Sequence, residues 1–234
     1  MLKCSFVLPT HNCAGWLHHA VDSCLTQNYK NIEVVVVDDA STDSTPKYFD
    51  YLKSLNDDRI KLIQLPENKG RSNARNEGNK VATGDIICVL DSDDMAFPQR
   101  AGLTVAQFEK GVKYLYASAV TVTALGDRVR DLIADTFNKE KSLSEMSNGI
   151  VHSTVAYTKD IAMEFPYRGG EISELGIDDF CQQTEIMLSG IKLDFIPNIV
   201  TAYRALITGV TMQRDNEKVM EAKKRFLESL KTTA

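Results

Sequence analysis

The chain has 234 residues, 43% of them hydrophobic and 25% charged, and carries a net charge of −5 at pH 7. This composition is ordinary for a globular protein, and the length suits one α/β domain with a large core. The acidic balance argues against nucleic acid as a partner, and no apolar run is long enough for a transmembrane segment.

The cysteines and the N-terminus indicate where the protein works. The five cysteines are odd in number and scattered, with no CxxC pair. This pattern does not support a zinc site or a disulfide framework, and it fits free thiols in a reducing compartment. The N-terminal apolar run is broken by Pro9, so a secretory signal is not predicted. We therefore expect a cytoplasmic protein, with peripheral membrane contact left open.

Strands and helices are predicted to alternate through the first half of the chain. Apolar runs predict strands over residues 4–8, 32–37, 60–65 and 86–90, and apolar residues at helical spacing predict helices over 16–25, 47–55 and 70–81. The 32–37 run is continuous and β-branched, which is typical of a strand buried on both faces. This alternation predicts a doubly wound, mostly parallel α/β sheet in a single domain.

The second half of the chain is less regular. A strand is expected over residues 114–123, and polar residues 126–149 suit helices or a mobile loop. An acidic start followed by helical spacing predicts a helix over 174–190, closed by Gly190, and a late strand follows over 192–196. Residues 217–230 form an amphipathic pattern, which predicts a helix packed on the domain or against a partner.

The most informative segment is an apolar run that begins after Asp85 and ends in Asp91-Ser92-Asp93-Asp94. In an open α/β sheet, ligands bind beyond the carboxyl ends of the strands. Asp91 and Asp93 would point to the same side if the strand ran straight through them. Carboxylates there are suited to hold Mn²⁺ or Mg²⁺ against a phosphate. The segment predicts a metal-bridged diphosphate as the ligand.

Two other loops would reach the same edge of the sheet, at Pro9–Asn12 and Asp38–Asp43, because the strands before them are predicted to be parallel. There Asp39 is placed to accept a hydrogen bond from a base or a ribose. Arg71 and Arg75, on the 70–81 helix, either offset phosphate charge or cover the sheet. The chain has no Walker motif, and no glycine-rich dinucleotide motif follows the first strand, which argues against ATPases and dinucleotide-dependent dehydrogenases.

Four motifs follow one another within residues 4–94. They read F-V-L-P-T-H-N at 6–12, V-D-D-A-S-T-D at 37–43, N-K-G-R-S-N-A-R-N-E-G at 68–78, and A-T-G-D-I through D-S-D-D at 82–94. In order and content they resemble the motifs of family-2 glycosyltransferases of the GT-A fold. The resemblance implies a nucleotide-sugar-binding half over 1–95, an acceptor-binding half over 96–205, and a C-terminal tail and helix over 206–234.

The resemblance also implies a donor and its site. The donor would be a nucleotide-diphosphate sugar, most often a UDP-sugar, bound through Mn²⁺ or Mg²⁺ at Asp91 and Asp93. Asp39 matches the carboxylate that reads the base, and His11 stands where the family often has a tyrosine near the base. The implied donor-binding residues are Pro9, Thr10, His11, Asn12, Asp39, Arg71, Arg75, Asp91, Ser92 and Asp93. The acceptor would be the hydroxyl of a sugar, a glycan or a lipid-linked glycan, as in polysaccharide synthesis.

The general base is expected in the acceptor half. Sugar transfer needs a carboxylate that takes the proton of the attacking hydroxyl. Family-2 enzymes carry it in a G-E-D-like motif at a helix start, and Gly176-Ile177-Asp178-Asp179 resembles that motif, with Ile177 in place of the usual Glu. Asp178 is the expected base and Asp179 its close rival, because the register can slip by one. One base and one metal suffice for an inverting single displacement.

A Y-R-x-H motif of the family is only partly repeated, by Tyr203-Arg204-Ala-Leu206, in which Leu206 replaces the histidine. Arg204 is a candidate phosphate ligand, whereas Tyr203 suits the core equally well. His152 lies where an acceptor-side segment is expected, and as a lone histidine it is at least as well explained by a structural role.

Two rival functions share some of these features. A haloacid-dehalogenase-like phosphatase also has an Asp-x-Asp (DxD) motif, like Asp91-Ser92-Asp93 here, at the end of a strand, and uses the first Asp as nucleophile. It expects the motif on the first strand, whereas three strands are predicted before Asp91, so this class is disfavoured. The second rival is a catalytically silent nucleotide-sugar-binding subunit that serves an active partner.

Overall fold

The computed structural model describes residues 1–206 and 215–231. Its first half alternates as the sequence predicts. The strands are β1 (Cys4–Thr10), β2 (Ile32–Asp38), β3 (Ile60–Gln64) and β4 (Ile86–Val89), and the helices between them are α1 (Leu17–Leu25), α2 (Thr45–Ser54) and α3 (Arg71–Val81). Pro46 lies in the first turn of α2, where a missing backbone N–H costs no hydrogen bond.

The second half adds shorter elements. They are β5 (Met95–Ala96), α4 (Arg100–Phe108), β6 (Tyr114–Val122), β7 (Arg128–Leu132), α5 (Lys139–Glu145), the 3₁₀ turn η1 (His152–Thr154), β8 (Ala156–Thr158), α6 (Lys159–Glu164), α7 (Glu171–Glu174), α8 (Asp178–Leu188), β9 (Asp194–Arg204) and α10 (Asn216–Lys231). Residues 207–214 of the expected C-terminal tail lie outside the described residues.

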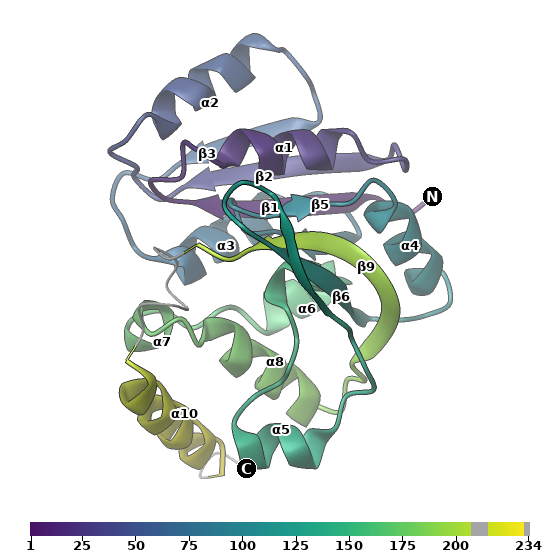
Figure 1. The fold of residues 1–234 in the computed structure, drawn as a ribbon, viewed down its shortest axis with the longest axis vertical. Helices are drawn as coiled ribbons and strands as arrows, with labels where there is room; N and C mark the ends of the chain where they lie inside the picture. The colour runs from purple at the N-terminus through teal and green to yellow at the C-terminus, as the bar shows by residue number, and fades with distance from the viewer. Residues whose placement is uncertain (207–214, 232–234) are drawn as a thin grey trace.

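The strands form one mixed sheet in the order β3-β2-β1-β4-β8-β6-β9-β5, with β7 paired to β6 (Figure 1). Strands β1 to β4 are mutually parallel, as predicted, with Phe6 opposite Val34 on one side and Cys88 on the other. Strand β8 then inserts antiparallel between β4 and β6. The parallel order brings the loops after β1, β2 and β4 to one edge, which is where the acidic loops lie.

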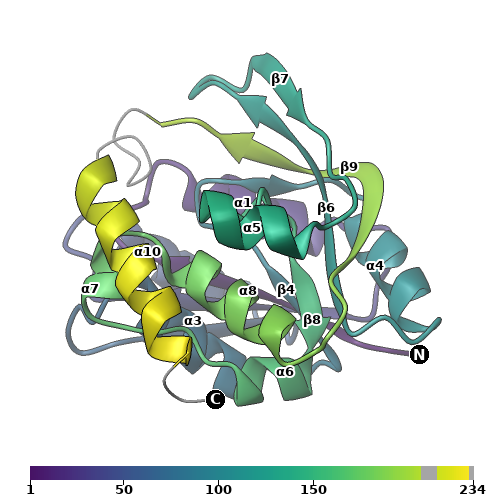
Figure 2. The same ribbon diagram turned by 90° about the horizontal axis from the view of Figure 1, so that it is seen from below.

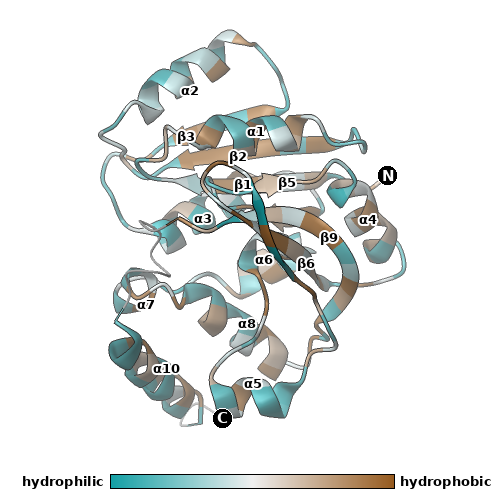
Figure 3. Cartoon of the chain, in the orientation of Figure 1, coloured by the Kyte–Doolittle hydropathy of each residue, from teal (hydrophilic) through white to brown (hydrophobic). Residues whose placement is uncertain are grey.

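Helices cover both faces of the sheet. Side chains of α1, α2 and α4 pack on one face, and those of α3, α6 and α8 pack on the other. Figure 3 shows the apolar strands running through the middle of the molecule, with polar residues on the outer sides of the helices. All seven residues of β1 and of β2 are buried, as expected for parallel strands covered on both faces. The fold is therefore the single α/β domain that the sequence predicts.

The second half differs from the sequence expectation in several places. The expected helix over 174–190 is two helices, α7 and α8, separated at Gly176, where φ is +63°. The late strand is longer than 192–196, because β9 continues to Arg204 alongside β6 after register shifts. The 126–149 segment contains both a strand and a helix. Helix α4 was missed, although Ala101, Val105 and Phe108 have helical spacing and are buried.

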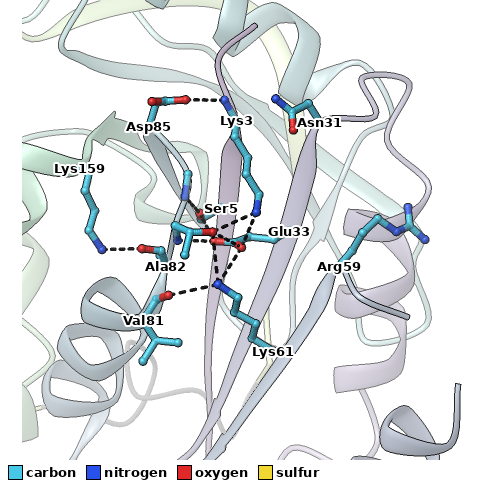
Figure 4. A network of polar contacts seen from close by, with 12 residues as sticks. Lys3, Ser5, Asn31, Glu33, Arg59, Lys61, Val81, Ala82, Asp85 and Lys159 are labelled. Carbon is cyan, nitrogen blue, oxygen red and sulfur yellow. Dashed lines mark hydrogen bonds and ion pairs between the residues drawn. The ribbon is translucent and has the colours of Figure 1, made fainter. Parts of the chain in front are cut away.

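A buried carboxylate fastens the amino ends of β1 and β2 (Figure 4). Glu33, which is 1% exposed, accepts hydrogen bonds from Lys3 Nζ at 2.7 Å and Ser5 Oγ at 2.6 Å. Thr83 Oγ1 donates to it at 2.7 Å, and Lys61 Nζ lies 3.0 Å away. Burial alone would raise the pKa of Glu33, but these hydrogen bonds outweigh burial and hold the pKa well below its usual range.

We expect Glu33→Gln to lower the free energy of unfolding by about 1–3 kcal/mol at pH 7, the range for hydrogen bonds to a charged group. A carboxylate whose pKa is depressed by folding stabilises the protein above its unfolded pKa of about 4.3, and this contribution is lost as the pH falls below that value. The difference between variant and wild type should therefore shrink between about pH 5 and pH 2. Urea unfolding across this range measures it. Glu67→Gln, at an exposed ion pair, is the control, and an equal loss there would contradict the account.

Candidate active site

Helix α3 lies unusually close to the sheet and thereby presents two arginines to the acidic edge. At Gly78 a Cβ atom would come within 2.5 Å of Val7 Cγ1 and 3.1 Å of Val37 Cγ2, so only glycine fits. The helix begins at Arg71, after Gly70, whose φ is +85°. Because the helix starts at this edge, Arg71 and Arg75 in its first turns lie beside the end of β4.

Arg75 joins the first half of the chain to the second half. Its guanidinium is 4% exposed and donates to Asp91 Oδ1 at 2.6 Å and to Asp178 Oδ2 at 2.5 Å. The ring of Tyr167 lies beneath it, with the guanidinium carbon 5.3 Å from the ring centre. Two carboxylates that are 87 residues apart in sequence are thus held by one cation. The sequence offered either phosphate neutralisation or sheet coverage for Arg75, and did not indicate this bridge.

The carboxylates after β4 differ in their ionisation. The strand ends at Val89 and a turn follows, in which the N–H of Asp94 donates to the carbonyl of Asp91, so the expected two-residue alternation does not apply. Burial raises the pKa of Asp91, but Arg75 outweighs it and the pKa is about 2. Burial and the charge of Asp91 raise the pKa of Asp93 to about 6. Burial and the charges of Asp93 and Asp91 also raise the pKa of Asp94.

The two candidate bases at the start of α8 have different surroundings. Asp178 is 2% exposed and bound to Arg75. Asp179 is half-buried and lines the same pocket, and burial together with the charge of Asp178 raises its pKa to about 6. A base must accept a proton near working pH and must be reachable by the acceptor. Asp179 has the raised pKa and is the more exposed of the two carboxylates, whereas Asp178 is buried against Arg75.

Asp39 and His11 lie together at the carboxyl ends of β1 and β2. Asp39 is 2% exposed, and its Oδ1 accepts the backbone N–H of Lys69 at 2.9 Å. His11 is exposed, and its Nδ1 lies 2.8 Å from the carbonyl oxygen of Asp39. Ala40, which follows, has a φ of +56°, a conformation that favours glycine.

The remaining donor-loop residues have mainly structural contacts in this state. Asn12 Oδ1 accepts the backbone N–H groups of Thr42 at 2.8 Å and Asp43 at 3.2 Å, and so ties the first loop to the second. Pro9 and Thr10 are buried in β1, with Pro9 paired with Val37 and Thr10 with Asp38. Ser92 is 8% exposed, between the two aspartates.

His152 belongs to a buried polar network on the acceptor side. It is 8% exposed, and its Nε2 lies 3.0 Å from the hydroxyl of Tyr167, which in turn lies 2.9 Å from that of Tyr157. Burial and the nearby Arg75 lower the pKa of His152 to about 3, so the ring is neutral at pH 7. His152 thus holds Tyr167, the ring on which the Arg75 guanidinium lies.

Arg204 anchors the acidic loop instead of facing a ligand. Its Nε donates to the carbonyl of Asp93 at 2.9 Å, and its Nη1 donates to that of Ala124 at 2.7 Å. Its backbone N–H donates to Asp94 Oδ1 at 2.8 Å, and its guanidinium lies 4.4 Å from the centre of the Trp16 ring system. Arg204 was a candidate phosphate ligand, and the structure does not support this role. The residue is 5% exposed, and its Nε and Nη1 groups donate to backbone carbonyls.

Several of these groups line a pocket of about 310 Å³. The lining includes Asp91, Arg71 and Arg75 from the first half of the chain and Asp178, Asp179 and His152 from the second half. Lys223 of α10 also lines it, and the sequence did not predict this residue. The pocket brings together the expected metal ligand Asp91 and both candidate bases, whereas Asp93 lies outside its lining.

The acidic end of β4 fits a divalent cation. Asp91 and Asp93 supply carboxylate oxygens, the ligands that Mg²⁺ and Mn²⁺ prefer, and a cation there would relieve the repulsion with Asp94. Within residues 1–206 and 215–231, no three His, Cys, Asp or Glu side chains are placed to hold a metal by themselves. This suits an ion that is held by one or two carboxylates and completed by phosphate oxygens.

We expect Arg75→Met to lower the free energy of unfolding by about 3–5 kcal/mol, because it leaves Asp178 buried without its cation. Arg71→Met, on the preceding turn of α3, is the matched control. Arg71 is half-buried and makes no hydrogen bond or ion pair with the described residues, so its loss should be within about 0.5 kcal/mol. Denaturant unfolding measures the free energy of unfolding of both variants. Equal values would show that the Arg75 bridge does not stabilise the fold.

The fold is shared with solved glycosyltransferases. S. aureus TarS matches with a TM-score of 0.70 at 22% identity, covering 87% of this chain and 60% of the TarS chain. The mannosyltransferase PcManGT from Pyrobaculum calidifontis matches with a TM-score of 0.68 at 19% identity, covering 89% of this chain and 59% of that one. The fold class of this chain is thus the GT-A fold.

The sequence itself belongs to a specific family within that class. Residues 5–158 match the model of glycosyl transferase family 2, so the chain is a member of that family. The putative glycosyltransferase EpsE of Bacillus subtilis is 40% identical over 112 residues, which are 48% of this chain and 40% of EpsE. The Escherichia coli glucosyltransferase WfaP is 41% identical over 90 residues, which are 38% of this chain and 35% of WfaP.

The chain thus spans less than half the length of these curated relatives. The range matched by the family model, residues 5–158, contains the four motifs at 6–94, and the family assignment confirms the resemblance on which the predicted donor site depends. In the part of the chain that the structure describes, no helix is both long and apolar enough to cross a membrane.

Proposed function

We propose that this chain is a metal-dependent, inverting glycosyltransferase that moves a sugar from a UDP-sugar to an acceptor hydroxyl. The observation that carries the proposal is the Arg75 bridge, because it places Asp91 of the DxD motif and the start of α8 around one pocket. The five free cysteines suit a cytoplasmic protein.

Three groups of residues are assigned to the donor. Asp39 and His11 would receive the base, Arg71 would approach the diphosphate, and Asp91 and Asp93 would hold Mn²⁺ or Mg²⁺. A bound divalent cation would stabilise the negative charge that develops on the leaving nucleoside diphosphate. TarS has been solved with UDP-GlcNAc, and PcManGT with GDP-Man and Mn²⁺, which supports a nucleotide-sugar donor and a metal.

Asp179 is assigned the role of general base. As the acceptor oxygen bonds to the anomeric carbon, the bond to the nucleoside diphosphate breaks and the hydroxyl proton moves to the Asp179 carboxylate. Asp178 then takes the place of the Glu in the family motif, and its ion pair with Arg75 positions the first turn of α8. The alignment with the G-E-D-like motif is therefore shifted by one residue, and the proposed base is Asp179 instead of the expected Asp178. A single attack from the face opposite the leaving group inverts the anomeric configuration.

The acceptor is proposed to be a glycan, with a lipid-linked glycan as the leading candidate. WfaP is named for transfer to α-D-GlcNAc-diphosphoundecaprenol, which supports a diphosphate-linked acceptor in polysaccharide synthesis. A polyprenyl carrier lies in a membrane, so the proposal includes peripheral membrane contact.

A screen of UDP-, GDP- and dTDP-sugars with and without Mn²⁺ tests the proposal. We expect Mn²⁺-dependent release of nucleoside diphosphate with a UDP-sugar, and a product whose anomeric configuration is inverted. Retention of configuration would contradict the single displacement. Donor binding with no turnover for any acceptor tried would favour the second candidate, a silent nucleotide-sugar-binding partner subunit.

A further inference from the structure

The C-terminal helix α10 forms part of the pocket that contains Asp179. Its buried residues meet the start of α8 in one apolar cluster, which contains Ile177, Phe180, Cys181, Val219, Ala222 and Phe226. Figures 1 and 2 both show α10 beside α7 and α8. An ion pair of 2.7 Å between Arg225 and Glu171 adds a contact between α10 and α7. Helix α10 is therefore built into the acceptor half.

Lys223 is the residue of α10 that reaches the pocket. It is 9% exposed and lines the pocket with Asp178 and Asp179. Its Nζ donates to the carbonyl oxygen of Met146 at 2.8 Å and lies 4.4 Å from the centre of the Phe180 ring. Lys223 thus connects three pieces of the wall: α10, the first turn of α8, and the end of α5, from which the pocket-lining segment 147–153 begins.

Charged groups approach Asp179 from three helices. Asp178 is its neighbour in α8, Arg75 comes from α3, and Lys223 comes from α10. Burial and the charge of Asp178 raise the pKa of Asp179. The hydrogen bond from the Phe180 N–H and the charges of Arg75 and Lys223 lower this pKa. The other ionisable groups near it, in its helix, on β6 or in the pocket lining, are Cys181, Tyr114, Arg71, Asp91, His152 and Tyr203. Arg75 is already bound to two carboxylates, so Lys223 adds a second cation to an acidic site.

We propose that Lys223 is a positioning residue for transfer: it fixes the 147–153 wall through Met146 and keeps a positive charge beside the Asp179 carboxylate. This inference rests on the proposed function, because it gives Lys223 a role in the reaction for which Asp179 is the base. It extends the catalytic unit to the C-terminal helix, beyond the part of the chain that matches the family model.

Removal of the Lys223 charge, together with its hydrogen bond to Met146, tests the proposal. Lys223→Met keeps the apolar stem on Phe180, so we expect the acidic limb of the pH profile of kcat/KM to move up by about 0.5–1 unit, with roughly two- to fivefold lower activity at pH 6. The donor KM should not change. Lys223→Arg should restore the limb, and Lys224→Met, at the exposed neighbour, should match wild type.

A readout without turnover separates this inference from the proposed function. The ¹³C titration of the Asp179 carboxyl group, assigned with Asp179→Asn, should show the same upward shift in Lys223→Met. If no donor is turned over, the proposed function fails, and this titration still decides the role of Lys223. Lys223→Gln, which can still donate to Met146, serves if Lys223→Met does not fold. An Asp179 pKa that is unchanged in the folded neutral variant overturns the proposal.

Discussion

Asp179→Asn should reduce the rate of sugar transfer by about 10²–10⁴-fold, the usual contribution of a general base. The asparagine side chain has the same shape but cannot take the acceptor proton. Donor binding should persist, because Asp179 lies at the start of α8, away from the loops after β1, β2 and β4 that are assigned to the donor. Steady-state kinetics together with donor binding by calorimetry measure both halves of the expectation.

Asp178→Asn is the matched comparison for this base assignment. It removes one carboxylate from Arg75, so its main effect should be on stability, with a smaller loss of turnover than in Asp179→Asn. For wild type at saturating Mn²⁺, activity should fall as the pH drops through about 6, where Asp179 takes up its proton. If Asp178→Asn abolishes turnover at wild-type stability while Asp179→Asn remains active, Asp178 is the base.

Asp93→Asn should reduce transfer by about 10²–10³-fold, the range for loss of one group that stabilises transition-state charge. The structure places Asp93 in a cluster of carboxylates whose repulsion a cation would relieve. If Asp93 acts through the metal, a chelator should bring wild type down to the level of the variant and should not slow the variant further.

Asp58→Asn controls for the loss of one negative charge, because Asp58 is exposed and far in sequence from the acidic edge. It should keep wild-type activity and wild-type sensitivity to chelator. A chelator effect that is as large in Asp93→Asn as in wild type would show that Asp93 does not act through a metal.

The donor half could be predicted from the sequence because each of its features is local. Apolar runs of strand length, such as 34–37, are buried in the sheet, and parallel strands bring the loops that follow them to one edge. The positions of Asp39 and Asp91 followed from that rule alone. The prediction that the strand runs straight through Asp93 was wrong, because the chain turns at Asp91–Asp94. This turn is held by Arg204, whose backbone N–H donates to Asp94, 110 residues away in sequence.

The acceptor half could not be predicted to the same degree because its structure depends on contacts between distant segments. Strand β8 has three residues, too few for a local signal, and it pairs antiparallel with β4 and β6. The Arg75 bridge needs α3 and α8 to meet, and the choice between Asp178 and Asp179 follows from which of them Arg75 binds. The pocket position of Lys223 could not be predicted, because an amphipathic sequence pattern does not indicate which segment the apolar face of the helix will pack against.

The binding of UDP to the wild-type chain, measured by calorimetry with Mn²⁺ and again with a chelator, tests the central claim most directly. The carboxylates at the end of β4 would repel a diphosphate unless a cation lies between the carboxylates and the phosphates. We predict measurable UDP binding with Mn²⁺ that weakens by at least about tenfold, or 1.4 kcal/mol, in its absence. Equal affinity under both conditions, or no binding of UDP under either, would contradict the account.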